Sequence, residues 1–188
     1  MALHLQDEVP CSGNTISRRD TNLMRNKQKG FSLIELLIVV AIILIIAAIA
    51  IPNLLRSKMA ANEASAVASC RTINTAEVVY SSTYNTSGVF SPSLAALSDG
   101  GTAANCAGGA VPTSTSACLI DPALEIATVA ATGKSGYIFT YAQATGTYSL
   151  LASPITVNST GVRFFFTDQT VVIRANAGSA ATNTSSPL

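Results

Sequence analysis

The feature that most constrains this chain is an unbroken apolar run near its N-terminus. From Leu36 to Ile51, sixteen consecutive residues are Leu, Ile, Val or Ala. Phe31 to Ile51 makes 21 residues, and at about 1.5 Å per residue a helix of that length crosses a hydrocarbon core of about 30 Å. The segment therefore predicts a single membrane-spanning helix, which we place at residues 31–52.

Charges are unevenly placed around this run. Five basic residues precede it: Arg18, Arg19, Arg25, Lys27 and Lys29. By the positive-inside rule the N-terminus is expected in the cytoplasm and the remainder outside. From Phe31 onward there are six basic and seven acidic side chains, a net charge of −1, so we expect no dedicated nucleic-acid binding.

Residue types needed for common catalytic sites are scarce. The one histidine, His4, lies far upstream of the apolar run. If the N-terminal piece is removed, histidine-dependent nucleophile arrangements and histidine-ligated metals are excluded. The acids Asp99, Asp121, Glu125 and Asp168 are scattered and form no calcium-binding run. We expect neither an enzyme nor a cofactor or metal, and a membrane-anchored enzyme is the least favoured alternative.

Two ordinary explanations of the apolar run are a secretory signal peptide and a single-span membrane anchor with no further role. A signal peptide has a shorter apolar core, of about 7–15 residues, followed by a small-x-small cleavage site. Here the run is longer and is followed by Pro52-Asn53-Leu54-Leu55. Both explanations are disfavoured.

The segment KGFSLIELLIVVAIILIIAAIAIPNLL, residues 29–55, resembles the N-terminus of type IV pilins and the related pseudopilins. The pattern consists of Gly30, Phe31, Glu35 and Pro52 around an apolar helix. The resemblance implies cleavage between Gly30 and Phe31 by a prepilin peptidase, which then N-methylates Phe31. It also implies a bacterial single-pass inner-membrane precursor, a membrane platform protein, a cytoplasmic ATPase and a helical homo-oligomer.

Glu35 is the one charged residue in the apolar segment. A charge at the centre of a spanning helix costs roughly 2.5–3.5 kcal/mol, and less near an end. With the family's processing, Glu35 is predicted to neutralise the amine of Phe31, of a neighbouring subunit or of its own chain, and so to set the register of assembly. The alternative is a carboxylate at the membrane rim that reaches the headgroups.

The family's short leaders suggest where the natural chain starts. Residues 24–30, from Met24 to Gly30, would form such a leader. We expect translation to start at Met24 and residues 1–23 to reflect an upstream start.

Beyond the membrane segment the helix is expected to continue to about Tyr84, with a kink at Pro52. Residues 53–84 are predicted to be amphipathic. The apolar stripe consists of Leu55, Met59, Ala66, Cys70, Ile73, Tyr80 and Tyr84. The polar residues expected largely outside it are Arg56, Lys58, Asn62, Glu63, Arg71, Asn74 and Glu77.

The remaining chain predicts an α+β fold, with this helix packed on an antiparallel meander of about four strands. Residues 85–136 are rich in loop-forming residues, with helical turns expected in FSPSLAALS and LIDPALEIATVA. Strands are predicted at 136–142, 147–153, 162–168 and 170–175, giving a sheet region of 137–175. Residues 176–188 offer too few apolar residues to bury and are predicted to be a flexible tail.

The chain contains four cysteines and three glycosylation sequons. If Cys11 leaves with the leader, Cys106 and Cys118 are the favoured disulfide, and pairing of Cys70 with either is the alternative. The sequons at Asn85, Asn158 and Asn183 are weak evidence for modification.

The leading functional hypothesis is a pilin that polymerises into a type IV pilus on the cell surface. The alternatives are a major pseudopilin of a type II secretion system, in a periplasmic pseudopilus, and a minor adhesin-like pilin. The sequence leaves motility, adhesion, DNA uptake and electron transfer open as roles.

Overall fold

A computed structural model of the chain describes residues 30–84, 89–102, 106 and 111–188. Its longest element is helix α1, Leu33–Thr83, of 51 residues. The helix passes through Pro52, as the sequence predicted, and the kink there stays a prediction. The chain divides into two units, Met1–Ile42 and Ile43–Leu188, and the described core residues of helix and sheet belong to the second.

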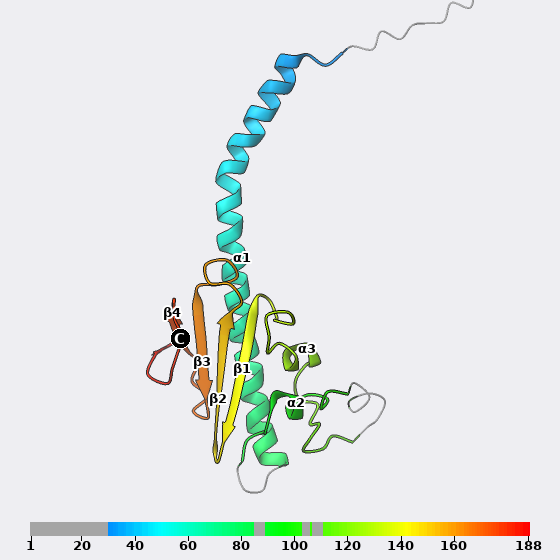
Figure 1. Ribbon diagram of the computed structural model, residues 1–188, viewed down its shortest axis with the longest axis vertical. Helices are drawn as coiled ribbons and strands as arrows, with labels where there is room; N and C mark the ends of the chain where they lie inside the picture. The colour runs from blue at the N-terminus through cyan, green and yellow to red at the C-terminus, as the bar shows by residue number, and fades with distance from the viewer. Residues whose placement is uncertain (1–29, 85–88, 103–105, 107–110) are drawn as a thin grey trace, which may run out of the picture. The chain divides into compact units, whose positions relative to one another are not determined.

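Five strands form one antiparallel sheet in the order β1-β2-β3-β4-β5. Figure 1 shows β1, β2 and β3 side by side in front of α1. They are β1 Tyr137–Ala144, β2 Thr147–Pro154, β3 Arg163–Asp168, β4 Arg174–Ala177 and β5 Ser186–Pro187. A two-residue turn joins β1 to β2, with Gly146 at φ +73°, where a side chain would be strained. The predicted α+β class is confirmed, with one strand more than expected.

The fourth predicted strand was placed too early. Residues 170–173 form no strand, and β4 begins only at Arg174. Asp168 ends β3, because its carboxylate accepts hydrogen bonds from the backbone N–H and the hydroxyl of Thr170, at 2.9 and 2.5 Å. This local turn competes with strand pairing, and it outweighs the β-branched residues that suggested a strand there.

The expectation that residues 176–188 have nothing to bury is wrong, and their flexibility stays a prediction. Residues after Asn176 continue the sheet through β5, and Ala181 is buried. Arg174 donates from Nη1 to the carbonyl of Ser185 at 3.0 Å, and the backbone N–H of Leu188 donates to the carbonyl of Ile173 at 3.0 Å. Backbone hydrogen bonds attach this segment to the sheet. Its apolar content alone does not predict such bonds.

Two short helices occupy the connection before the sheet, where the sequence predicted helical turns. They are α2, Leu94–Leu97, and α3, Pro122–Glu125, capped by the side chains of Ser93 and Asp121. The N–H of Leu119 donates to the carbonyl of Leu97 at 2.7 Å, which links two parts of this connection. The N–H of Phe139 donates to the carbonyl of Ala127 at 2.7 Å, which links the connection to β1.

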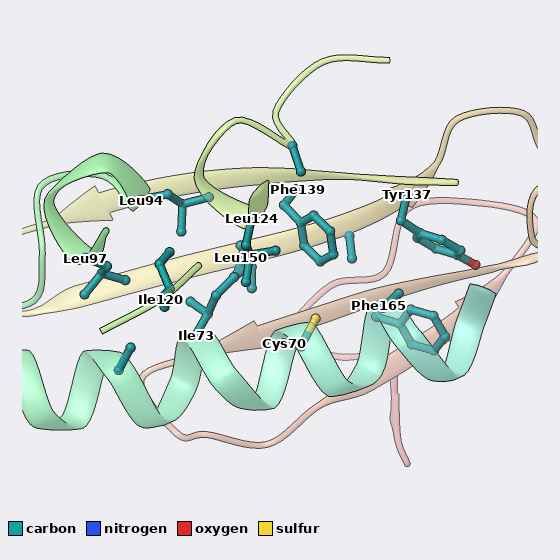
Figure 2. Close-up of a cluster of buried hydrophobic side chains, with 14 of the residues drawn as sticks. Cys70, Ile73, Leu94, Leu97, Ile120, Leu124, Tyr137, Phe139, Leu150 and Phe165 are labelled. Atoms are coloured by element: carbon teal, nitrogen blue, oxygen red, sulfur yellow. The ribbon is translucent and has the colours of Figure 1, made fainter. Parts of the chain in front are cut away.

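The core lies between the second half of α1 and the inner face of the sheet. Figure 2 shows Cys70 and Ile73 on α1 facing Phe139, Leu150 and Phe165 from three strands. The predicted stripe is correct from Ala66 to Tyr80, and Met59 and Tyr84 are half-buried. Leu55 was wrongly included. It is 55% exposed, because it lies beyond the sheet and nothing in the described head covers it.

Candidate assembly segment

The candidate assembly segment, residues 30–55, contains the start of α1. The N–H of Leu36 donates to the carbonyl of Ser32 at 3.1 Å, so Ser32 immediately precedes the first turn of α1. Glu35 lies in that turn, and Ser-x-x-Glu is the spacing of a capping box. An acid here interacts favourably with the helix dipole, by about 0.3–1 kcal/mol. This gives Glu35 a local role even before any partner is considered.

The apolar residues that follow are unpartnered. Every Leu, Ile and Val from Leu33 to Leu55 is between 45% and 80% exposed. In the part of the chain that the structure describes, α1 is the one helix long and apolar enough to cross a membrane, and none of its most apolar window is buried. Because exposed apolar area costs about 25 cal/mol per Å² in water, this segment requires lipid or other helices around it.

Gly30 and Phe31 lie just before the helix, and both are exposed. A Cβ added at Gly30 would meet no atom within 4 Å, so nothing in the described fold requires glycine there. The bond between the two residues is therefore accessible. Cleavage at this bond, methylation of Phe31 and pairing with Glu35 stay predictions, and residues 1–29, with Cys11 and the expected leader start, lie outside the described residues.

Three polar residues of α1 that the sequence analysis placed mainly outside the stripe are buried within it. They are Glu63, Asn74 and Glu77. Each lies three or four residues from a buried apolar neighbour, so position, rather than polarity, would have identified them. Together they attach α1 to three separate parts of the head.

Glu63 holds the start of β3. Its carboxylate accepts hydrogen bonds from the backbone N–H groups of Val162 and Arg163, at 2.9 and 3.1 Å, and from Arg163 Nε at 2.7 Å. Burial alone would raise the pKa of Glu63, but these hydrogen bonds and the guanidinium charge bring it below its usual value. Glu63 is therefore a charged anchor.

Asn74 connects α1 to β2 and β3. Its Nδ2 lies 2.9 Å from the Thr167 hydroxyl, and its Oδ1 accepts from Tyr148 at 3.0 Å. Since the side chains of Asn74 and Thr167 are both fully buried, this network satisfies polar groups that would otherwise be costly.

Glu77 is fully buried and faces hydroxyl and amide donors. It accepts from the Ser91 N–H at 2.9 Å, from the Ser91 hydroxyl at 2.5 Å and from the Tyr141 hydroxyl at 2.6 Å. Burial raises the pKa of Glu77 more than these hydrogen bonds lower it. The same burial and the neighbouring Glu77 raise the pKa of the Tyr141 phenol.

The cysteines form the pairing that the sequence favoured. Cys106 and Cys118 are joined by a disulfide with an S–S distance of 1.98 Å and a Cα–Cα distance of 5.7 Å. Cys70 is a buried free thiol, and burial raises its pKa to about 12. Cys70 therefore serves as a core residue.

The scattered acids of the head have local roles. Asp121 caps α3, Asp168 closes the turn after β3, and Asp99 accepts from the Gly101 N–H at 3.0 Å. Burial and the neighbouring Asp99 raise the pKa of Glu125. Among the described residues no three His, Cys, Asp or Glu side chains form a group that could hold a metal.

Of the three sequons, Asn158 and Asn183 are exposed, and Asn85 lies outside the described residues. Exposure allows modification at Asn158 and Asn183 without requiring it, so glycosylation stays a prediction.

Comparison with known proteins identifies the N-terminal segment. Residues 25–51 match the prokaryotic N-terminal methylation motif. Over 40 residues the chain is 65% identical to the type IV wide pilus major component PilA4 of Thermus thermophilus, a match that covers 21% of this chain and 30% of that protein. The chain thus matches less than a third of its relative's length. No solved structure shows a significant match.

The matched motif contains Gly30, Phe31 and Glu35, and it lies at the start of a helix whose second half packs on an antiparallel sheet. The chain carries the prokaryotic N-terminal methylation motif at the start of an α+β fold, and over its matched segment it is similar to a type IV pilus major component.

Proposed function

We propose that this chain is a structural subunit of a type IV pilus. It is made as a single-pass membrane precursor, cleaved between Gly30 and Phe31, N-methylated at Phe31 and polymerised through α1. The observation that carries the proposal is the exposed apolar half of α1, with Glu35 in its first turn, on a head whose own core is complete.

The physical basis for assembly is burial of the apolar half of α1. In the membrane, lipid covers these side chains; in a filament, the same half-helices of neighbouring subunits cover one another. The described part of the head does not cover them, because it packs its own core on Ala66, Ile73 and Tyr80 of the other half of α1. Polymerisation therefore exchanges lipid contacts for contacts with other helices.

Glu35 and the amine of Phe31 supply the register. Cleavage creates a cationic amine, and methylation retains its charge. A carboxylate and an ammonium in apolar surroundings are each costly alone, and removal of one member of a buried pair costs about 3–5 kcal/mol. Subunits that stack so that Glu35 meets a Phe31 amine are therefore favoured over other registers.

Gly30 supports the cleavage step. Since the described fold gives no steric reason for a glycine, recognition by a processing peptidase accounts better for its presence. The flanking bond is exposed, and the motif match begins upstream of it, at residue 25.

The proposed pathway requires membrane partners. These are a prepilin peptidase that also methylates, a platform protein in the inner membrane and a cytoplasmic ATPase that drives extraction. The precursor has its N-terminus in the cytoplasm, and the product is an extracellular filament. That the matched relative is named a major pilus component favours a major pilin over a pseudopilin or a minor adhesin.

The proposal is tested by deleting the gene and restoring it as wild type, Glu35→Gln or Glu35→Asp. Surface filaments are counted by electron microscopy, and membrane precursor is measured by immunoblot. We expect filaments with wild type, a loss of at least tenfold with Glu35→Gln and partial recovery with Glu35→Asp, at equal precursor levels. Normal filaments from Glu35→Gln would contradict the pairing, and normal filaments in the deletion strain would contradict the pilin assignment.

A further inference from the structure

Three chain segments meet at the end of the head from which the apolar half of α1 emerges (Figure 1). They are residues 56–63, 134–137 and 154–163. Asn62 donates from Nδ2 to the carbonyl of Thr160 at 2.8 Å. The N–H of Ile155 donates to the carbonyl of Gly136 at 2.9 Å. These contacts gather the three segments around one section of the helix.

This end of the head is basic. We call the four cations of these segments the basic rim: Arg56, Lys58, Lys134 and Arg163. They are four of the six Lys and Arg residues that follow Pro52, and the same segments contain one acid, Glu63. Glu63 is already paired with Arg163 at 2.7 Å.

Within the described ranges, three members of the basic rim have no counterion. Among the described residues, the side chains of Arg56, Lys58 and Lys134 make no ion pair or hydrogen bond. Arg56 and Lys58 are exposed, and Lys134 is half-buried. The positive charges of these side chains are therefore accessible to an anionic partner.

The position of the basic rim along α1 suggests what that partner is. Leu55 is the last residue of the exposed apolar segment, and Arg56 follows it directly. Lys58 lies three residues beyond Leu55, or about 5 Å along the helix axis. When the apolar half lies in a bilayer, these cations lie at the depth of the phosphate groups. The exposed Val157 lies on the 154–163 segment at the same end.

We propose that the basic rim binds the headgroups of anionic phospholipids in the leaflet that faces the head. This inference rests on the proposed function, because it concerns the membrane precursor. Each Lys or Arg near an anionic surface strengthens binding about fivefold. The basic rim thus fixes the depth of the head on the membrane before assembly, and its lipid contacts must be released on extraction.

A second copy of the chain is the competing partner. The lipid is favoured because the cations continue directly from the apolar segment on the same helix. An acidic surface on another copy would have no reason to coincide with the edge of that segment. The distinction is testable, since lipid binding depends on headgroup charge and self-association depends on protein density.

The experiment uses the full chain reconstituted into vesicles of phosphatidylcholine alone or of an equal mixture with phosphatidylglycerol. Hydrogen exchange is measured over residues 155–161, with insertion checked by resistance to alkaline extraction. We expect slower exchange in the mixture than in phosphatidylcholine, with the difference lost at high salt.

Matched variants locate the effect. Arg56→Gln should reduce the difference severalfold. Arg56→Gln, Lys58→Gln and Lys134→Gln combined should abolish it, since they weaken the attraction on the order of 100-fold. Arg71→Gln is the control, because Arg71 is also an exposed arginine of α1 but lies away from the basic rim. It should behave as wild type.

Three results would overturn the inference. One is equal exchange in both vesicle types by an inserted chain. Another is protection in phosphatidylcholine alone that grows with the protein-to-lipid ratio, which would assign the basic rim to a second copy. A chain extracted by alkali from both vesicle types would overturn the proposed function, and this inference with it.

Discussion

The hydroxyl of Tyr141 on β1 donates to the carboxylate of Glu77 on α1 across 2.6 Å, inside the head. The same hydroxyl lies 2.8 Å from the carbonyl of Ser91, which begins the segment leading to α2. One phenol thus joins three parts of the chain, and its partner Glu77 has no exposed surface. The stability of the head should depend on this contact.

Tyr141→Phe is expected to destabilise the head by about 1–3 kcal/mol, because it removes a hydrogen bond to a buried acceptor. Thr140→Ala, at the adjacent and exposed position of β1, should cost under about 0.5 kcal/mol. Urea unfolding of the full chain in detergent measures both. Equal stability of Tyr141→Phe and wild type would show that the network does not support the fold.

The raised pKa of Glu77 predicts a pH dependence. Because the folded pKa lies above the unfolded value near 4.5, the folded state binds the proton more tightly. The stabilisation is complete below the unfolded pKa and is lost as pH rises through the folded pKa. Glu77→Gln should therefore flatten the fall in unfolding free energy just above pH 4.5. An unchanged slope would contradict a raised pKa at Glu77.

The pKa of Glu63 is shifted in the opposite direction from that of Glu77. Variants at Glu63 and at its partner Arg163 distinguish the contribution of hydrogen bonds from that of the ion pair. The lowered pKa of Glu63 contributes stability above the unfolded value, and this is lost as pH falls through the folded pKa. Glu63→Ala should cost about 2 kcal/mol, because it strands the N–H groups of Val162 and Arg163. Arg163→Gln should cost less than about 1 kcal/mol, since the Arg163 side chain is 46% exposed. Equal costs in denaturant titrations would assign the stabilisation to the ion pair.

Reduction of the Cys106–Cys118 disulfide is expected to lower stability by roughly 3 kcal/mol, chiefly by freeing the unfolded chain. Cys106→Ser with Cys118→Ser should match the reduced protein. In the oxidised protein, Cys70 should resist alkylation until the head unfolds, because its thiol is buried with a pKa of about 12. Mass spectrometry after thiol labelling checks both expectations, and rapid labelling of Cys70 in the folded state would contradict them.

The sequence predicted the parts of this fold that depend on periodicity. The uninterrupted apolar run predicts a helix that lies in lipid or among other helices. The spacing of Ala66, Cys70, Ile73 and Tyr80 predicts the buried face of α1. β2 and β3 alternate in the same way and were placed within one residue.

Spacing along α1 indicates that Glu63, Asn74 and Glu77 face the head, but the groups that satisfy them are distant in sequence, so the sequence could not predict those partners. Glu63 is buried because backbone N–H groups 99 and 100 residues away point at it. Likewise, β5 depends on a backbone ladder and on Arg174, neither of which appears as an apolar pattern. Processing at Gly30 and pairing of Glu35 with the Phe31 amine are predictions from the motif.

The most direct test of the central claim is the N-terminal sequence and intact mass of this chain from purified filaments. We predict a chain that begins at Phe31, carries one added methyl group on its terminal amine and retains the Cys106–Cys118 disulfide. Filaments built from chains in which Gly30 is still joined to Phe31 would contradict the account, because no terminal amine would exist for Glu35 to meet.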